Sequence, residues 1–125
     1  MKTKVYVSFF MILFFISAAI LVGCTAKKNT YGQHISGTTI TGIGDILANP
    51  GQFNQKIVRI EGKIIEECPA GGWFILKDAT GIIYVDLHPS YFAIPQAVGS
   101  NVTAEGTIKK DGPRIVVVGK GVQIK

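Results

Sequence analysis

A few side chains in this sequence could form a metal or redox site, and they are spread along the chain. The 125 residues include two cysteines and two histidines. Asp86 and His88 lie two positions apart at the end of an expected strand, so their side chains would point to the same face. With Cys68 they could supply three ligands to a metal ion. One hypothesis is therefore a metal- or redox-linked role.

The sequence does not contain the patterns of common catalytic centres. It has no Ser-His-Asp order, no phosphate-binding glycine loop and no haem-attachment spacing. A catalytic cleft needs a base and a nucleophile, and one of the two histidines, His34, lies in a polar stretch near the N-terminus. We therefore expect a protein that is not an enzyme and that carries no cofactor.

The residues best suited to bind a ligand are aromatic or basic and lie in the middle of the chain. Exposed aromatic rings stack on bases and sugars, and basic groups attract anions. Trp73 and Phe74 point to opposite faces of a strand, so at most one of them is deep in a core. The alternative is that Trp73 is itself mainly a core residue. The candidate ligand-binding residues are Trp73, Phe74, Lys77, Tyr84, Arg59, Lys63 and Tyr91.

The N-terminus has the organisation of an export signal. Lys2 and Lys4 precede an uncharged apolar run over residues 5–22. The sequence Leu21-Val22-Gly23-Cys24 that follows resembles a bacterial lipobox. The resemblance implies cleavage before Cys24 and attachment of diacylglycerol to its sulfur, with membrane lipid as the partner. The alternative is an uncleaved signal anchor in which Cys24 is incidental.

Both interpretations place the rest of the chain outside the cytoplasm and tied to a membrane. We expect a lipid-anchored protein of the cell membrane, or of the outer membrane where the host has two, facing the periplasm or the extracellular side. Loss of residues 1–23 removes two lysines and leaves 11 basic and 8 acidic residues, a net charge of +3. Such a weakly basic balance is compatible with solubility near anionic lipid.

The chain after the signal divides into two parts. Residues 24–41 carry Cys24 and are polar and rich in threonine and glycine, which is typical of a flexible linker. Residues 42–125 form the folded domain. A short helix is expected over residues 42–50, with Ile43, Ile46 and Leu47 on one face, ended by Pro50.

Five strands are expected after this helix. They cover residues 56–66, 73–77, 82–87, 101–109 and 114–118, with 122–124 as an extension of the last. In the first strand Val58, Ile60 and Ile64 share the inward face, and Gly62 indicates a bulge or a sharp bend. Three strands, a proline-containing loop and two more strands are the order of an OB-fold, a small five-stranded all-β barrel. An SH3-like barrel and an open meander are the alternatives.

Several segments resemble bacterial OB-fold domains of the nucleic-acid-binding, anticodon-binding-like type. The resemblance rests on residues 45–64, on the second and third strands over 74–85, and on residues 98–108, and it extends over 43–125. It implies nucleic acid as a possible partner. OB-folds usually bind ligands on the face of strands two and three, between flanking loops. Here that face would be bounded by residues 68–72 and by Tyr91 and Phe92.

The primary functional hypothesis is a ligand- or partner-binding module at the cell envelope, with an envelope protein or a small ligand as the partner. The first alternative is binding of single-stranded nucleic acid or another polyanion, which a steep loss of affinity with salt would support. The second is the metal- or redox-linked role of Cys68, Asp86 and His88. A purely structural envelope protein is a third possibility.

Overall fold

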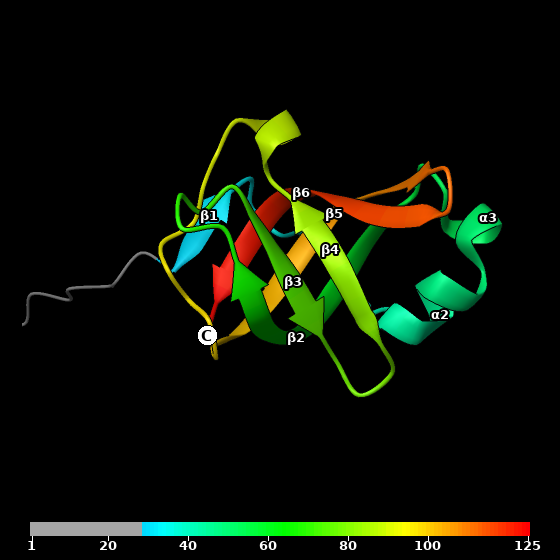
Figure 1. Ribbon diagram of the computed structural model, residues 1–125, viewed down its shortest axis with the longest axis horizontal. Coiled ribbons are helices and arrows are strands. Elements are labelled where there is room, and N and C mark those ends of the chain that lie inside the picture. The colour runs from blue at the N-terminus through cyan, green and yellow to red at the C-terminus, as the bar shows by residue number, and fades with distance from the viewer. Residues whose placement is uncertain (1–28) are drawn as a thin grey trace, which may run out of the picture.

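The computed structural model describes residues 29–125, which form a small β-barrel with short helices at its ends (Figure 1). The expected signal segment and Cys24 lie outside the described residues. None of the helices formed by residues 29–125 has the length and apolar character needed to span a bilayer. The strands are β1 (Thr30–Gly32), β2 (Ile57–Glu67), β3 (Trp73–Lys77), β4 (Ile82–Asp86), β5 (Asn101–Asp111) and β6 (Arg114–Ile124). The helices are α2 (Ile43–Ala48), α3 (Pro50–Phe53) and the 3-10 turn η2 (His88–Ser90).

Strands β2 to β6 close into a barrel. The strand order is β1-β6-β4-β3-β2-β5, and an additional pairing between β6 and β5 joins the two ends. All pairings are antiparallel except that of β4 with β6, which is parallel. This closure confirms the expected five-stranded OB-fold-like barrel and rules out the open meander.

Strand β2 shows how the sequence pattern produces the barrel wall. Val58, Ile60 and Ile64 point inward and are buried, as predicted. The irregularity in pairing with β3 falls between Ile64 and Glu66, not at Gly62. At Gly62 a Cβ atom would lie 2.4 Å from the carbonyl oxygen of Lys77. Glycine is therefore needed there because β3 approaches closely, and the bulge lies two residues later.

The expected helix over residues 42–50 forms as two shorter helices. α2 ends at Ala48, and Pro50 begins α3, because proline is accepted at the first position of a helix. Ile43 and Ile46 are fully buried, but Leu47 is 40% exposed, so the prediction that it shares their buried face was wrong.

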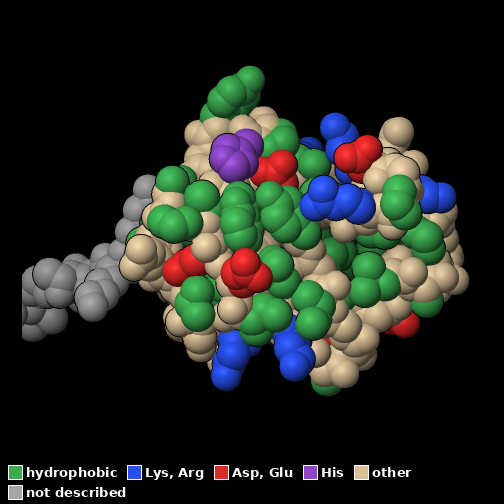
Figure 2. All heavy atoms as spheres, viewed as in Figure 1, with side chains coloured by type: hydrophobic (Ala, Val, Ile, Leu, Met, Phe, Trp, Pro, Cys, Tyr) green, Lys and Arg blue, Asp and Glu red, His purple; other side chains and the backbone are tan. Residues whose placement is uncertain are grey.

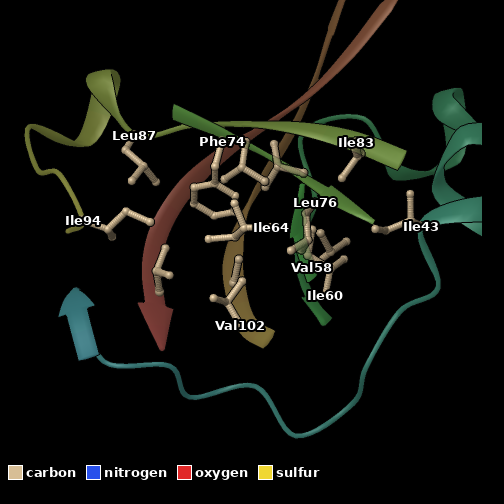
Figure 3. Packing of buried hydrophobic residues seen from close by; sticks show 14 of the residues in the cluster. Ile43, Val58, Ile60, Ile64, Phe74, Leu76, Ile83, Leu87, Ile94 and Val102 are labelled. Atoms are coloured by element: carbon tan, nitrogen blue, oxygen red, sulfur yellow. The ribbon is translucent and has the colours of Figure 1, made fainter. Parts of the chain in front are cut away.

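The stretch expected to be a linker lies against the barrel over its described part. β1 pairs with β6, with Tyr31 opposite Val122. The Gln33 N–H then donates to the Lys120 carbonyl, and the Thr41 N–H donates to the Arg59 carbonyl, each at 2.8 Å. Figure 3 shows residues between β1 and the helices curving around the core. Backbone hydrogen bonds hold this segment on the barrel. The linker was expected because the segment has few apolar residues to bury, and that criterion does not detect backbone pairing.

The core fills the barrel and is covered at both ends (Figure 3). Ile43 of α2 packs at one end, and Leu87 and Ile94 lie at the other. Phe74, Leu76 and Val85 point into the interior from β3 and β4 and are fully buried. The opposite face of these two strands is therefore turned outward.

Candidate ligand-binding groove

The outer face of β3 and β4 carries a pair of stacked aromatic rings. Trp73 is paired with Asp86 and Ile75 with Tyr84, so Trp73 and Tyr84 are diagonal neighbours on this face. Their ring centroids are 5.5 Å apart, with an angle of 30° between the planes. Both side chains are half-buried, which leaves part of each ring open to a ligand.

A cation extends this aromatic pair. The parallel pairing of β4 with β6 sets Tyr84 beside Val116, and Arg114 lies two residues earlier on β6. The Arg114 guanidinium carbon lies 5.7 Å from the centre of the Tyr84 ring, within cation–π range. Burial raises the pKa of the Tyr84 phenol, the Asp86 carboxylate raises it further, and Arg114 partly offsets both. Tyr84 is therefore a neutral ring at physiological pH.

A groove of about 550 Å³ opens between β4 and the β5–β6 hairpin. Its volume lies within the range of small-molecule sites. Three of its lining residues are basic and two are acidic, and Tyr84, Val116 and Val118 supply apolar surface. Figure 2 shows hydrophobic side chains at the centre of this face of the molecule, with Lys or Arg side chains beside them. The charged lining residues are Lys109, Lys110, Arg114, Asp86 and Asp111.

One end of the groove is bordered by η2. The Asp86 carboxylate accepts from the His88 backbone N–H at 3.1 Å and lies 2.9 Å from His88 Nδ1. Pro89 lines the groove. Tyr91, in a left-handed conformation with φ 56°, ends η2 and is 96% exposed. Tyr91 therefore lies on the loop after β4, as expected, but is not part of the groove lining.

Two of the predicted binding residues have other positions. Phe74 is fully buried in the core, so its prediction as a ligand-binding residue was wrong: it shares the inward face with Leu76. Arg59 lies on β2 and donates a hydrogen bond to the Gly37 carbonyl, while Glu105 accepts from the Gly37 N–H at 2.8 Å. Arg59 therefore holds the N-terminal segment against the barrel, away from the groove.

The two predicted lysines lie together but outside the groove. Lys63 on β2 is directly opposite Lys77 on β3, and both are exposed. Lys77 is at the end of β3 remote from Trp73. The prediction grouped these lysines with the aromatic residues, and the structure separates them along the strand.

The residues proposed for a metal site do not form one. Cys68 is a free, half-buried cysteine. Among residues 29–125 no three His, Cys, Asp or Glu side chains gather closely enough to hold a metal ion. Asp86 and His88, which were expected to point to the same face, contact each other as a pair.

The basic side of the groove was not predicted from the sequence. Lys109, Lys110 and Arg114 belong to the β5–β6 hairpin. The loop between strands four and five is one of those that flank OB-fold ligand sites. The expected strands left residues 110–113 as that loop, with Lys109 and Arg114 at the strand ends on either side of it, so these cations could have been included.

Comparison with known proteins supports the fold. No protein-family model matches this chain, and no curated protein matches it. The structure of "the hypothetical protein ygiW from E. coli" matches with 18% identity and a TM-score of 0.52, over 76% of this chain and 97% of that chain. A "putative aspartyl-tRNA synthetase from Leishmania major Friedlin" matches with 16% identity and a TM-score of 0.56, over 75% of this chain and 22% of that chain. At these identities the likeness establishes the fold alone. The chain is thus an OB-fold-like barrel with a cationic and aromatic groove on the face where such barrels commonly bind.

Proposed function

We propose that this chain is a non-catalytic, lipid-anchored binding module of the cell envelope whose groove holds an anionic ligand containing a ring. The layered arrangement of Arg114, Tyr84 and Trp73 carries the proposal. An aromatic surface accepts a ring by stacking, and neighbouring cations select an anion. The lipobox-like sequence ending at Cys24 supports the anchoring.

The cations of the groove are placed to act together. Lys109, Lys110 and Arg114 come from both strands of one hairpin and outnumber the acidic residues of the lining. Asp86 is already occupied by His88, which reduces its repulsion of an anion. The groove therefore combines a basic side with the ring of Tyr84, against which Trp73 stacks.

Single-stranded nucleic acid is the second candidate, because it combines bases that stack with a regular row of phosphates. The likeness to a protein described as a tRNA synthetase is compatible with it. An acidic polysaccharide also carries a row of negative charges, but it has no aromatic bases. The two can be separated by experiment.

The test uses the full chain purified in detergent and the fluorescence of Trp73, the only tryptophan. Oligothymidylate and heparin are titrated separately at low salt. Quenching by oligothymidylate that weakens steeply with salt supports nucleic acid, and a response to heparin alone supports acidic polysaccharide. A flat response to both overturns the groove as a site for anionic polymers.

Two matched variants locate the binding. Arg114→Gln removes the cation over Tyr84 and should weaken binding about 5- to 30-fold, the usual effect of a desolvated cation. Lys63→Gln removes one positive charge outside the groove lining and should leave the affinity within about twofold. Equal losses in both variants would indicate attraction by net charge and not by the groove.

A further inference from the structure

One row of backbone contacts crosses neighbouring strands of the barrel wall, starting where the described chain begins. The Ile124 N–H donates to the Asn29 carbonyl at 2.8 Å, and the Lys125 N–H donates to the Asn101 carbonyl at 2.9 Å. Asn101 is in turn paired with Lys63, and Lys63 with Lys77. These residues follow one another across neighbouring strands and mark one edge of the barrel wall, from the ends of β6 and β5 through the middle of β2 to the end of β3. We call it the basal end, formed by Asn29, Lys63, Lys77, Asn101 and Lys125.

The basal end carries cations that the protein itself does not neutralise. Lys63 and Lys77 are a like-charge cross-strand pair, which is unfavourable in isolation. Within residues 29–125 neither lysine forms an ion pair. Lys125 also lies here, but it is paired with Glu61 at 3.0 Å. Figure 2 shows Lys or Arg side chains projecting at the lower edge of the molecule.

Exposed apolar side chains lie among these cations. Val98, in the loop before Asn101, is 57% exposed, and Ile65, at the irregularity in β2, is 42% exposed. The Gly99 N–H donates to the Ile64 carbonyl at 2.8 Å, which ties this loop to β2 beside Ile65. Cations combined with exposed aliphatic groups are what an anionic bilayer surface attracts.

The distance along the chain from the lipidation site points to the same partner. Cys24 is five residues before Asn29 in the sequence, and five fully extended residues span at most about 18 Å. If the chain were free as far as Thr41, the same limit would be about 60 Å. Because Asn29 is bonded to Ile124, an anchor at Cys24 holds the basal end close to the bilayer.

We propose that the basal end rests on the anionic surface of the bilayer and that the groove faces away from it. The proposal rests on the proposed anchoring through Cys24. The hairpin of the groove is at the other end of β5, ten residues beyond Asn101, or about 30 Å along the strand. A ligand in the groove would therefore come from the space beyond the bilayer and not from its headgroups.

The test measures which end of the barrel lies at the membrane. The full chain is produced in a bacterial host that processes lipoproteins and is reconstituted into phosphatidylglycerol vesicles with a headgroup-linked quencher. In a Cys68→Ser background, a fluorophore is attached at Ser100→Cys, at the basal end, or at Pro113→Cys, in the hairpin turn. We expect strong quenching at position 100 and several-fold weaker quenching at 113. Equal quenching at the two positions would overturn the orientation.

Two further double variants test whether the basal lysines hold the barrel on the bilayer. Replacing both Lys63 and Lys77 by glutamine should lower the ratio of docked to undocked protein about 25-fold, since each lysine near an anionic surface contributes about fivefold. Replacing Lys109 and Lys110 by glutamine removes the same charge from the hairpin and should leave the ratio unchanged. Equal effects of the two double variants would overturn a specific role of the basal end.

Labelling with radioactive fatty acid distinguishes a failure of the proposed anchor at Cys24 from a failure of the proposed orientation. A wild-type chain that incorporates no label, like Cys24→Ala, would overturn the anchor and with it the short tether. A chain that is labelled at Cys24 but quenched equally at positions 100 and 113 would overturn the orientation alone.

Discussion

Asp78 and Ile43 are 35 positions apart in the sequence and are joined by a hydrogen bond of 2.9 Å from the Ile43 N–H to the Asp78 carboxylate. The other carboxylate oxygen accepts from the Thr80 N–H, the Thr80 hydroxyl and the Gly81 N–H. Gly42, the residue before α2, supplies no side-chain cap. The turn between β3 and β4 therefore caps the helix that closes this end of the barrel.

Removing the Asp78 carboxylate should destabilise the domain through this helix. Asp78→Ala leaves the Ile43 N–H and the turn donors without their acceptor, and we expect a loss of about 2 kcal/mol. Urea unfolding of the full chain in detergent, followed by Trp73 fluorescence, measures the change. Asp111→Ala, in the exposed β5–β6 turn, is the control and should cost less than about 0.5 kcal/mol. Equal losses would show that the cap contributes nothing particular.

The same carboxylate should make the stability depend on pH. Partial burial of Asp78 opposes ionisation, but the hydrogen bonds from Ile43, Thr80 and Gly81 outweigh it and lower its pKa. The Glu61 pKa is also lowered, by hydrogen bonds from Lys125 and Thr103. A carboxyl whose pKa is lowered in the folded state stabilises the fold at pH values above its pKa in the unfolded state, about 4. This contribution is lost as the pH falls through the folded-state pKa.

We therefore expect the free energy of unfolding to fall as the pH is lowered below about 5. In Asp78→Asn the curve should be flatter, because one of the titrating groups has been removed. Urea unfolding at a series of pH values measures the slope, with Asp111→Asn as the matched control. A slope in Asp78→Asn as steep as that of the wild type would contradict the assignment.

Gly62 and Gly51 offer a matched test of close packing in the barrel. A Cβ atom at Gly62 would lie 2.4 Å from the Lys77 carbonyl oxygen, whereas at Gly51 no atom lies within 4 Å. Gly62→Ala should therefore cost about 1–3 kcal/mol, because β2 and β3 must separate. Gly51→Ala in α3 should be neutral or stabilise by up to about 1 kcal/mol. Thermal unfolding compares the two, and similar melting temperatures would refute the close approach.

The sequence could predict the strands because their apolar alternation survives in the structure. It could not decide between Trp73 and Phe74, since Trp73-Phe74-Ile75-Leu76 is apolar at every position. Only the pairing with β2 and β4, set by barrel closure, turns Phe74 and Leu76 inward and Trp73 outward. The alternation in β2, where charged residues separate the apolar ones, left no such ambiguity.

The site was less predictable than the fold because its residues are brought together by long-range pairing. Arg114 reaches Tyr84 only through the parallel contact of β4 with β6, which a local pattern does not reveal. Arg59 had the right residue type for a binding cation, but its partners are Gly37 and the segment before α2. That segment is held by backbone hydrogen bonds, so its polar composition indicated a linker instead.

The contact between Trp73 and Tyr84 provides a direct optical test of the groove. Burial, reinforced by Asp86, raises the Tyr84 pKa, so the folded state favours the neutral phenol up to a higher pH than the unfolded state does. The contribution of the neutral Tyr84 phenol to stability is present at pH values below the ordinary tyrosine pKa, about 10. It is lost as the pH rises through the pKa of Tyr84 in the folded state. Trp73 emission should therefore fall in a step above pH 10 as a tyrosinate forms 5.5 Å away. The step should disappear in Tyr84→Phe and persist in Tyr91→Phe, and a step unchanged by Tyr84→Phe would place the quencher elsewhere.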